Sequence, residues 1–541
     1  MKLNTRWPMM RCHLALAATM WVLCAHVASA STPPDPSGRT GNAPEDASHK
    51  TVVAQDIESA AEHASAKEAE IATTHQISLG SRTLNYHATV GTLTLRDDGG
   101  KPSASVFYVA YALDEHGSSK QRPITFFFNG GPGAPSMSLH LASFAPVRID
   151  TGENPVYIRP APYAYGPNPH TLLDKTDMVF LDAIGTGYSR ALGDLADKAF
   201  WSTDADIDVF AKAITRYLTK NSRWNSPKLL FGESYGTTRA AMLAYRLQQS
   251  HVVLNGVILL SSVLNHNLPH SGDLQSYVGI LPSYAAAAYY HHRVKDPPAD
   301  FNGFLRRAEA FATGPYAALL AKGQRASEQE RDDIANQMSG LTGLSADFLK
   351  QANFRLGWGN FAKELLRDLH RTVGVFDARY AGIDTDPQSR TPSYDQLENS
   401  VSGALVAVLN DYLVRDLRYK TDMTYRTDPR EINGAWDWSH KGPSADYSHE
   451  HLPYATLDLA AAMRINPDLK VLSLGGIYDL ATPYFTTEYE LDQMMLEPQL
   501  QKNLEVHTYP SGHMAYVNPA ALASMHEDIA HFVDGATAGG Q

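Results

Sequence analysis

Cysteine is almost absent from this chain of 541 residues, which has only two. Both of them, Cys12 and Cys24, lie within the first thirty residues. That segment begins with basic residues, continues with an apolar stretch from Leu14 to Val27, and ends on the small residues Ala28-Ser29-Ala30. The pattern is typical of a secretory signal peptide, so we predict cleavage after Ala30. The exported chain, periplasmic or secreted, would then contain no disulfide.

Long apolar runs and an excess of basic residues are missing as well. A retained membrane anchor is the alternative to a signal peptide, but the apolar stretch is short for a span and His26 interrupts it. A lipoprotein site at Cys24 lacks the small residues expected before it, because Trp21-Val22-Leu23 precede it. The chain has 46 Lys and Arg against 58 Asp and Glu, a net charge of −12. Since phosphate binding needs a basic surface, this balance argues against nucleic acid as the main partner. We therefore expect neither nucleic acid binding nor stable membrane insertion.

Apolar residues make up 43% of the chain, which is enough for a large core. Their distribution divides the chain into five segments. These are a signal peptide (1–30), a linker with a short helix at 57–71 (31–74), the first part of an α/β core (75–264), a mainly helical cap insertion (265–452) and the second part of the core (453–541).

The core segments alternate short apolar runs with helical stretches. This alternation predicts a mostly parallel sheet with helices on both faces. Two longer β-favouring segments near the start, separated by the turn Asp97-Asp98-Gly99-Gly100, predict an antiparallel hairpin. The predicted strands are Thr83–Thr94, Ala104–Leu113, Ile124–Phe128, Met178–Leu181, Leu229–Phe231, Val257–Leu260 and Val471–Leu474.

The strongest local signal is Gly232-Glu233-Ser234-Tyr235-Gly236, between an apolar run and a helical stretch. A glycine two places either side of a serine, at a strand-to-helix turn, is the pattern of a nucleophile elbow. The tight turn exposes the hydroxyl of Ser234 above the sheet and directs backbone N–H groups toward the same point. The alternative is a structural serine in a turn.

A glycine cluster, Asn129-Gly130-Gly131-Pro132-Gly133, directly follows the predicted strand Ile124–Phe128. We predict that the N–H of Gly131 and that of Tyr235 form an oxyanion hole. A phosphate-binding loop is the competing interpretation, but Pro132 removes an N–H and no Gly-Lys-Ser/Thr follows. A plain turn is the third interpretation.

Serine is a weak nucleophile until a base takes its proton. His513, in Ser511-Gly512-His513-Met514, is the candidate base. Asp479, just after the predicted strand Val471–Leu474, is the candidate acid that orients it. Asp492 and Asp528 are nearby alternatives to Asp479. The order Ser234, Asp479, His513 predicts a triad that needs no cofactor and no metal.

Other polar and aromatic groups have weaker signals. His449-Glu450-His451 does not have the spacing that places two histidines on one helical face, so we interpret it as a non-metal segment. His291-His292 is interpreted as a polar surface pair. Trp436 and Trp438 fit either a pocket wall or ordinary packing.

Together these motifs resemble the serine carboxypeptidase family, an α/β-hydrolase family. The resemblance covers about residues 120 to 525 and rests on the glycine cluster, the elbow, Asp479, His513 and the motif 180–189 (Phe-Leu-Asp-Ala-Ile-Gly-Thr-Gly-Tyr-Ser). It implies peptide substrates with a free C-terminus and removal of C-terminal residues. It also implies that Asn129, Gly130 and Glu233 hold the substrate carboxylate. Two carboxylates repel unless one is protonated, which favours activity at acid pH.

The chain departs from the family pattern in four places. Ser143 stands where a second Glu is usual, Ile184 where a Pro is usual, and Ile477 where an extra Asp is frequent. The disulfides of eukaryotic members are absent. These departures indicate a diverged, bacterial type of member. They leave open an esterase or acyltransferase that uses the same triad on a small-molecule substrate.

Overall fold

The computed structural model describes residues 64–114, 122–152, 157, 160–266, 273–443 and 452–538. The chain divides into two units, residues 1–56 and 57–541, and all the described residues belong to the second. The predicted signal peptide lies outside them, as does most of the predicted linker. No helix within these ranges is long and apolar enough to cross a membrane.

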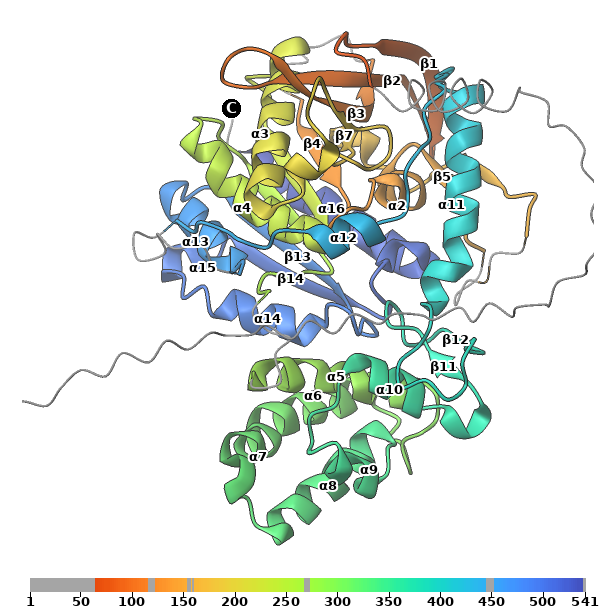
Figure 1. Cartoon of the computed structure of the whole chain (residues 1–541), viewed down its shortest axis with the longest axis vertical. Coiled ribbons are helices and arrows are strands. Elements are labelled where there is room, and N and C mark those ends of the chain that lie inside the picture. Colours follow the sequence, from red (N-terminus) through yellow and green to blue (C-terminus); the bar gives the residue numbers. More distant parts are fainter. Residues whose placement is uncertain are drawn as a thin grey trace, which may run out of the picture. The chain divides into compact units, whose positions relative to one another are not determined.

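One mixed sheet organises the described chain (Figure 1). Its order is β1-β2-β3-β7-β4-β9-β10-β13-β14, and β8 pairs with β3. The strands from β7 to β14 are parallel, whereas β1, β2, β3 and β7 pair antiparallel. The strands are β1 (Glu70–Leu79), β2 (Arg82–Arg96), β3 (Pro102–Leu113), β4 (Ile124–Phe128), β7 (Asp177–Leu181), β8 (Arg190–Ala191), β9 (Lys228–Glu233), β10 (Gly256–Leu260), β13 (Lys470–Gly476) and β14 (Leu504–Tyr509).

Short strands form two small ladders beside this sheet. They are β5 (Val147–Ile149) with β6 (Tyr165–Pro167), and β11 (Thr372–Val373) with β12 (Ala381–Gly382). The helices are α2 (Met137–Leu139), α3 (Thr203–Lys220), α4 (Tyr235–Gln249), α5 (Leu274–Tyr290), α6 (Phe301–Phe311), α7 (Ala317–Lys322), α8 (Glu328–Thr342), α9 (Ala346–Gln351), α10 (Trp358–Glu364), α11 (Gln396–Arg415), α12 (Arg430–Ala435), α13 (Ala455–Ile465), α14 (Tyr484–Asp492), α15 (Pro498–Gln501) and α16 (Pro519–Thr537).

The central strands β4, β7, β9 and β10 are buried along their whole length because both faces of the sheet are covered. Alternate side chains point to opposite faces. Phe127 stacks on Phe180 and Phe231, with ring centroids 4.8 and 4.9 Å apart, in a cluster shared with α11 and α16. Phe126 and Leu230 belong to the other cluster, shared with α3, α4 and α13. The predicted α/β class, with a mostly parallel sheet and helices on both faces, is confirmed.

The start of the core differs from the prediction. Residues 64–69 contain no helix, and β1 begins at Glu70, inside the segment predicted as linker and helix. Pairing explains the difference, since β1 matches β2 at every position from Glu70 opposite Gly91 to Leu79 opposite Arg82. Side chains of β1 alternate between half-buried and exposed, which is the pattern of a strand with one covered face.

The insertion predicted over 265–452 contains two kinds of element. Helices α5 to α10 surround a hydrophobic cluster of their own, which also takes in Ile477, Tyr478 and Leu480 from the core loop after β13. Helix α11 instead packs its buried side chains against the sheet cluster of β4 and β9. The insertion therefore shares its interior with the core at two places.

Candidate active site

Ser234 lies at the turn between β9 and α4, with φ 59° and ψ −130°. This backbone conformation is strained for a residue with a side chain and is typical of a functional turn. A Cβ atom on Gly232 would collide with the carbonyl of Gly236, and one on Gly236 would lie 2.7 Å from the carbonyl oxygen of Phe128. Only glycine fits at either position, which explains the spacing of the elbow.

His513 and Asp479 are in contact. Nδ1 of His513 lies 2.7 Å from Oδ2 of Asp479, and both side chains are buried. Burial opposes protonation of His513, but the charge of Asp479 and its hydrogen bond outweigh burial and raise the pKa of the imidazole. The carboxylate is itself fixed, because Oδ1 of Asp479 accepts the N–H groups of Ala481 and Thr482 at 2.8 and 3.0 Å.

Two residues that the sequence analysis did not select hold this pair. The hydroxyl of Thr482 donates to Oδ2 of Asp479 at 2.6 Å and lies 3.0 Å from Nδ1 of His513. The ring of Phe376, from the insertion, stacks on the imidazole with centroids 4.8 Å apart. The N–H of His513 donates to the carbonyl of Phe376 at 2.6 Å.

The end of β10 connects the serine to the histidine. The N–H of Ser234 donates to the carbonyl of Leu260 at 3.0 Å, and the hydroxyl of the next residue, Ser261, donates to the carbonyl of His513 at 2.7 Å. Within the described ranges, no hydrogen bond joins Oγ of Ser234 to Nε2 of His513. The two residues thus flank one strand end, with the hydroxyl not yet bonded to the imidazole. Catalytic hydrogen bonds commonly tighten only when substrate is bound.

The predicted alternatives to Asp479 have other surroundings. Oδ2 of Asp528 accepts a hydrogen bond from Tyr509 at 2.6 Å. Asp492 is exposed at the end of α14. Of the three aspartates, Asp479 is the one that contacts His513.

The glycine cluster lies against the start of α4. A Cβ atom on Gly130 would collide with the N atom of Tyr235 and lie 2.7 Å from that of Gly236. Gly131 has φ +103°, a conformation that favours glycine. Tyr235 opens α4, so its N–H has no partner within the helix. The segment from Gly130 to Gly131 and the N-terminus of α4 are therefore close enough to serve one ligand oxygen.

Asn129 and Glu233 form a buried polar group in which Tyr516 is the third member. Nδ2 of Asn129 donates to Oε2 of Glu233 at 2.6 Å, and the hydroxyl of Tyr516 lies 2.8 and 3.0 Å from the two carboxylate oxygens. Burial raises the pKa of Glu233 to about 7, against the lowering effect of His513 and of these two hydrogen bonds. The carboxyl is therefore largely protonated at acid pH.

Ser143, which stands where a second Glu was expected, takes no part in this group. It is fully buried, and its hydroxyl donates to the carbonyl of Leu139. The sequence did not point to Tyr516. Its position three residues after His513 was the one available signal.

Arg239 on α4 binds the main chain of Asn129 and so stabilises the same site. Its guanidinium is fully buried, pairs with Asp206 at 2.6 Å, and donates to the carbonyl of Asn129 at 2.6 Å. A charged residue inside an otherwise small and apolar stretch of α4 was the signal that the sequence offered.

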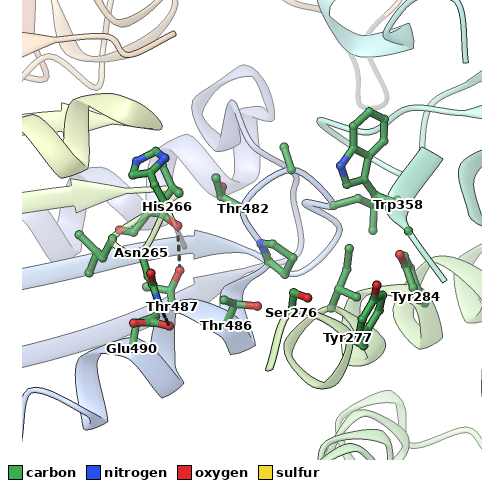
Figure 2. A pocket seen from close by; sticks show the side chains of 18 of the residues that line it. Asn265, His266, Ser276, Tyr277, Tyr284, Trp358, Thr482, Thr486, Thr487 and Glu490 are labelled. Carbon is green, nitrogen blue, oxygen red and sulfur yellow. Dashed lines mark hydrogen bonds between the residues drawn. The ribbon is translucent and has the colours of Figure 1, made fainter. Parts of the chain in front are cut away.

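Aromatic side chains continue from the elbow toward a cavity. The ring of Tyr235 contacts those of Trp436 and Trp438 at 5.4 and 5.8 Å between centroids, and Trp438 lies 4.6 Å from His266. His266 lines a cavity of about 340 Å³ that Thr482 also lines (Figure 2). The two tryptophans therefore pack against the residue after Ser234.

The remaining predicted groups lie elsewhere. His291 is half-buried and bonds to the carbonyl of Ala378 at 2.6 Å, whereas His292 is exposed. The segment His449-Glu450-His451 lies outside the described residues. Within the described ranges, no group of three or more His, Cys, Asp or Glu side chains is placed to hold a metal ion.

Residues 83–299 match the family model of the serine carboxypeptidases. This match covers less than half of the chain. The fold agrees, since a prohormone-processing carboxypeptidase, Kex1(Δ)p from Saccharomyces cerevisiae, superposes with a TM-score of 0.50 at 15% identity, covering 83% of this chain and 90% of that one. The superposition supports the α/β-hydrolase fold, and the family match makes a serine carboxypeptidase the function to be proposed and tested.

Two further solved structures are similar at lower scores. A proline iminopeptidase from Mycobacterium smegmatis has a TM-score of 0.33 at 14% identity, covering 87% of this chain and 100% of that one. Esterase E22 has a TM-score of 0.35 at 12% identity, covering 86% and 100%. No curated protein matches the sequence.

Proposed function

We propose that this protein is an exported serine carboxypeptidase that hydrolyses C-terminal peptide bonds through an acyl-enzyme on Ser234. Export rests on the signal-peptide pattern of residues 1–30. The observation that carries the carboxypeptidase assignment is the buried group of Asn129, Glu233 and Tyr516, directly before the nucleophile. A protonated carboxyl there donates a hydrogen bond to the C-terminal carboxylate of a peptide.

The reaction proceeds in two halves. His513 takes the proton of Ser234 as its oxygen attacks the scissile carbonyl, and the resulting oxyanion is held by the N–H groups of Gly131 and Tyr235. His513 then returns the proton to the leaving amine, so the C-terminal residue departs and an ester forms on Ser234. Water, deprotonated by His513, hydrolyses this ester and releases the shortened peptide. Asp479 orients the imidazole throughout.

Glu233 and His513 influence one another's protonation. Glu233 raises the pKa of His513, and His513 lowers that of Glu233. The productive state has the proton on Glu233 and a neutral His513. A substrate carboxylate beside Glu233 stabilises that distribution, because a second negative charge there favours the protonated acid. Binding of a substrate with a free C-terminus therefore favours the neutral form of His513, which is the form that acts as a base.

The test compares a blocked dipeptide with its C-terminal amide between pH 4 and 8. We expect the ratio of kcat/KM, free acid over amide, to fall as Glu233 loses its proton, by about tenfold from one pH unit below its pKa of about 7 to one unit above it. Ser234→Ala should abolish both activities and the labelling by a fluorophosphonate probe. Labelling that persists in Ser234→Ala, or a ratio near one at all pH values, would contradict the proposal.

An esterase or acyltransferase on a small-molecule acyl substrate is the second candidate. It is favoured by Ser143, because the carboxylate-binding group here contains a single carboxyl, with Tyr516 beside it. Equal turnover of the acid and the amide, together with fast hydrolysis of simple esters, would select this candidate.

A further inference from the structure

A cavity of about 340 Å³ adjoins the candidate triad, between the insertion helix α5 and the core helix α14. Thr482, whose hydroxyl contacts both Asp479 and His513, is one of the residues that line it. Figure 2 shows Tyr277, Tyr284 and Trp358 on one side of the cavity and His266, Asn265 and Glu490 on the other. Glu490 and Thr482, which contacts the candidate proton-transfer groups, thus line the same cavity.

Glu490 is buried, with 2% of its surface exposed, and its side chain interacts with those of Asn265 and Tyr454. Oε1 accepts a hydrogen bond from Nδ2 of Asn265 at 3.2 Å, whereas Oε2 accepts no hydrogen bond of good geometry, with Tyr454 as the other polar side chain beside the carboxylate. A buried carboxylate oxygen without a partner is costly, so such a group usually serves a ligand.

The surroundings of Glu490 are acidic. The side chain of Asp273, at the start of α5, likewise has one buried oxygen without a partner. Burial raises the pKa of Glu490, and the charge of Asp273 raises it further. Among the described residues that line the cavity, none is Lys or Arg. A positively charged ligand group would offset both the burial of the Glu490 carboxylate and the neighbouring negative charge of Asp273.

The cavity and the carboxylate-binding group lie on opposite sides of the nucleophile. In the sheet, β9 has β4 on one side and β10 on the other. Asn129 directly follows β4, whereas Ser262 and Val263, which line the cavity, follow β10. A peptide whose C-terminal carboxylate is held at Asn129 and Glu233 therefore directs the side chain on the acyl side of the scissile bond toward the cavity.

Only a long substrate side chain can reach Glu490 from the scissile bond. Glu490 follows Pro483, at the start of α14, by about two helical turns, which corresponds to on the order of 10 Å. A lysine or arginine side chain can cross the cavity from the side of Tyr277, Tyr284 and Trp358, whose rings suit its apolar stem, to Glu490 on the opposite side.

We propose that this cavity selects substrates with a lysine or arginine on the acyl side of the scissile bond, and that Glu490 is the residue that pairs with the basic group. The inference rests on the proposed function, since it assigns a substrate class to that site.

The experiment uses blocked dipeptides with one leaving residue, leucine, and either arginine or its neutral analogue citrulline on the acyl side. For the wild type we expect kcat/KM to be about tenfold or more higher for arginine, since a buried charged pair is strongly specific. In Glu490→Gln the ratio should approach one. Glu488→Gln, on the same helix, is the matched control and should keep the wild-type ratio.

A comparison within the wild type makes the test independent of how the variant folds. Lysine should be preferred over norleucine, and this preference should disappear with 2,4-diaminobutyrate over 2-aminobutyrate, because the shorter amine cannot reach Glu490. A ratio of kcat/KM, arginine over citrulline, below about threefold would overturn the inference. A larger ratio that is unchanged in Glu490→Gln would overturn it as well. Turnover of the citrulline substrate that depends on Ser234 would leave the proposed function intact in that case. Absence of turnover for every substrate would reject the proposed function itself.

Discussion

Thr482 joins the acid and the base of the candidate triad through one hydroxyl. It donates to Oδ2 of Asp479 at 2.6 Å and lies 3.0 Å from Nδ1 of His513, while its own N–H binds Oδ1 of the same carboxylate. Thr482 also lines the cavity beside the site. It is therefore a positioning residue for His513.

Replacing Thr482 by valine should keep its shape and remove the hydroxyl. We expect kcat/KM on a blocked dipeptide to fall by about 10- to 100-fold, the effect of losing a hydrogen bond to a charged group. Thr482→Ser should restore most of the activity. A valine variant with wild-type kcat/KM and an unshifted pH profile would show that the hydroxyl does not position His513.

At the scale of residues, the sequence pointed to candidate groups such as Asp479 and His513, which lie in contact, but not to the side chains that hold them. The spacing around Ser234 reflects a backbone constraint, since a Cβ at Gly232 or Gly236 collides with neighbouring backbone, and such constraints can be read from a motif. Tyr516 and Thr482 could not be selected in the same way. Their roles arise from contacts between distant segments, which leave no local pattern in the chain.

His440 follows Trp436 and Trp438 in the chain and contacts side chains on two core helices. Nδ1 lies 2.6 Å from Asp204 on α3, and Nε2 lies 3.2 Å from Asp458 on α13. Burial opposes protonation of the imidazole, but hydrogen bonds to the two carboxylates outweigh it and raise its pKa to about 9.

This contact should make the stability of the protein depend on pH. Because the pKa of His440 is higher in the folded state than the usual 6.5, its contribution is fully present below pH 6.5 and is lost as pH rises through about 9. We expect His440→Gln to be less stable than the wild type by on the order of 2 kcal/mol at pH 6, with a smaller difference near pH 10. Thermal unfolding measured at several pH values checks this. Curves for the two proteins that stay parallel over the whole range would contradict it.

At the scale of elements, the sequence predicted those strands that are buried on both faces of the sheet. Strands β4, β7, β9 and β10 are buried throughout, so their apolar runs identified them. Strands β1 and β14 lie at the two edges of the sheet and expose many side chains, so neither has such a run. Their strand character comes from pairing with a neighbour, which composition does not record.

Across the described chain, the insertion and the core share one interior. The loop after β13 carries Asp479, and its neighbours Ile477, Tyr478 and Leu480 lie in the cluster formed by helices α5 to α10. Unfolding of those helices would therefore expose the surroundings of Asp479 as well.

Leu349 on α9 is fully buried in that cluster and does not line the cavity. We expect Leu349→Ala to lower the free energy of unfolding by about 2–5 kcal/mol through the cavity that it leaves. In urea, the loss of helical circular dichroism and the loss of Ser234 labelling should occur together, at a lower concentration than in the wild type. Leu243→Ala, on α4 and in the cluster that α4 shares with the sheet, is the comparison variant. A separate early transition that leaves Ser234 labelling intact would show that the insertion unfolds independently.

The bond from the N–H of His513 to the carbonyl of Phe376 bears on how such an enzyme can be re-engineered. Phe376 comes from a segment that an engineer would treat as an exchangeable lid, yet its main chain binds the candidate general base, His513. Grafting a foreign lid to alter selectivity would detach that anchor unless the graft kept the stretch from Val375 to Asp377. A chimaera should therefore join the donor segment upstream of this stretch.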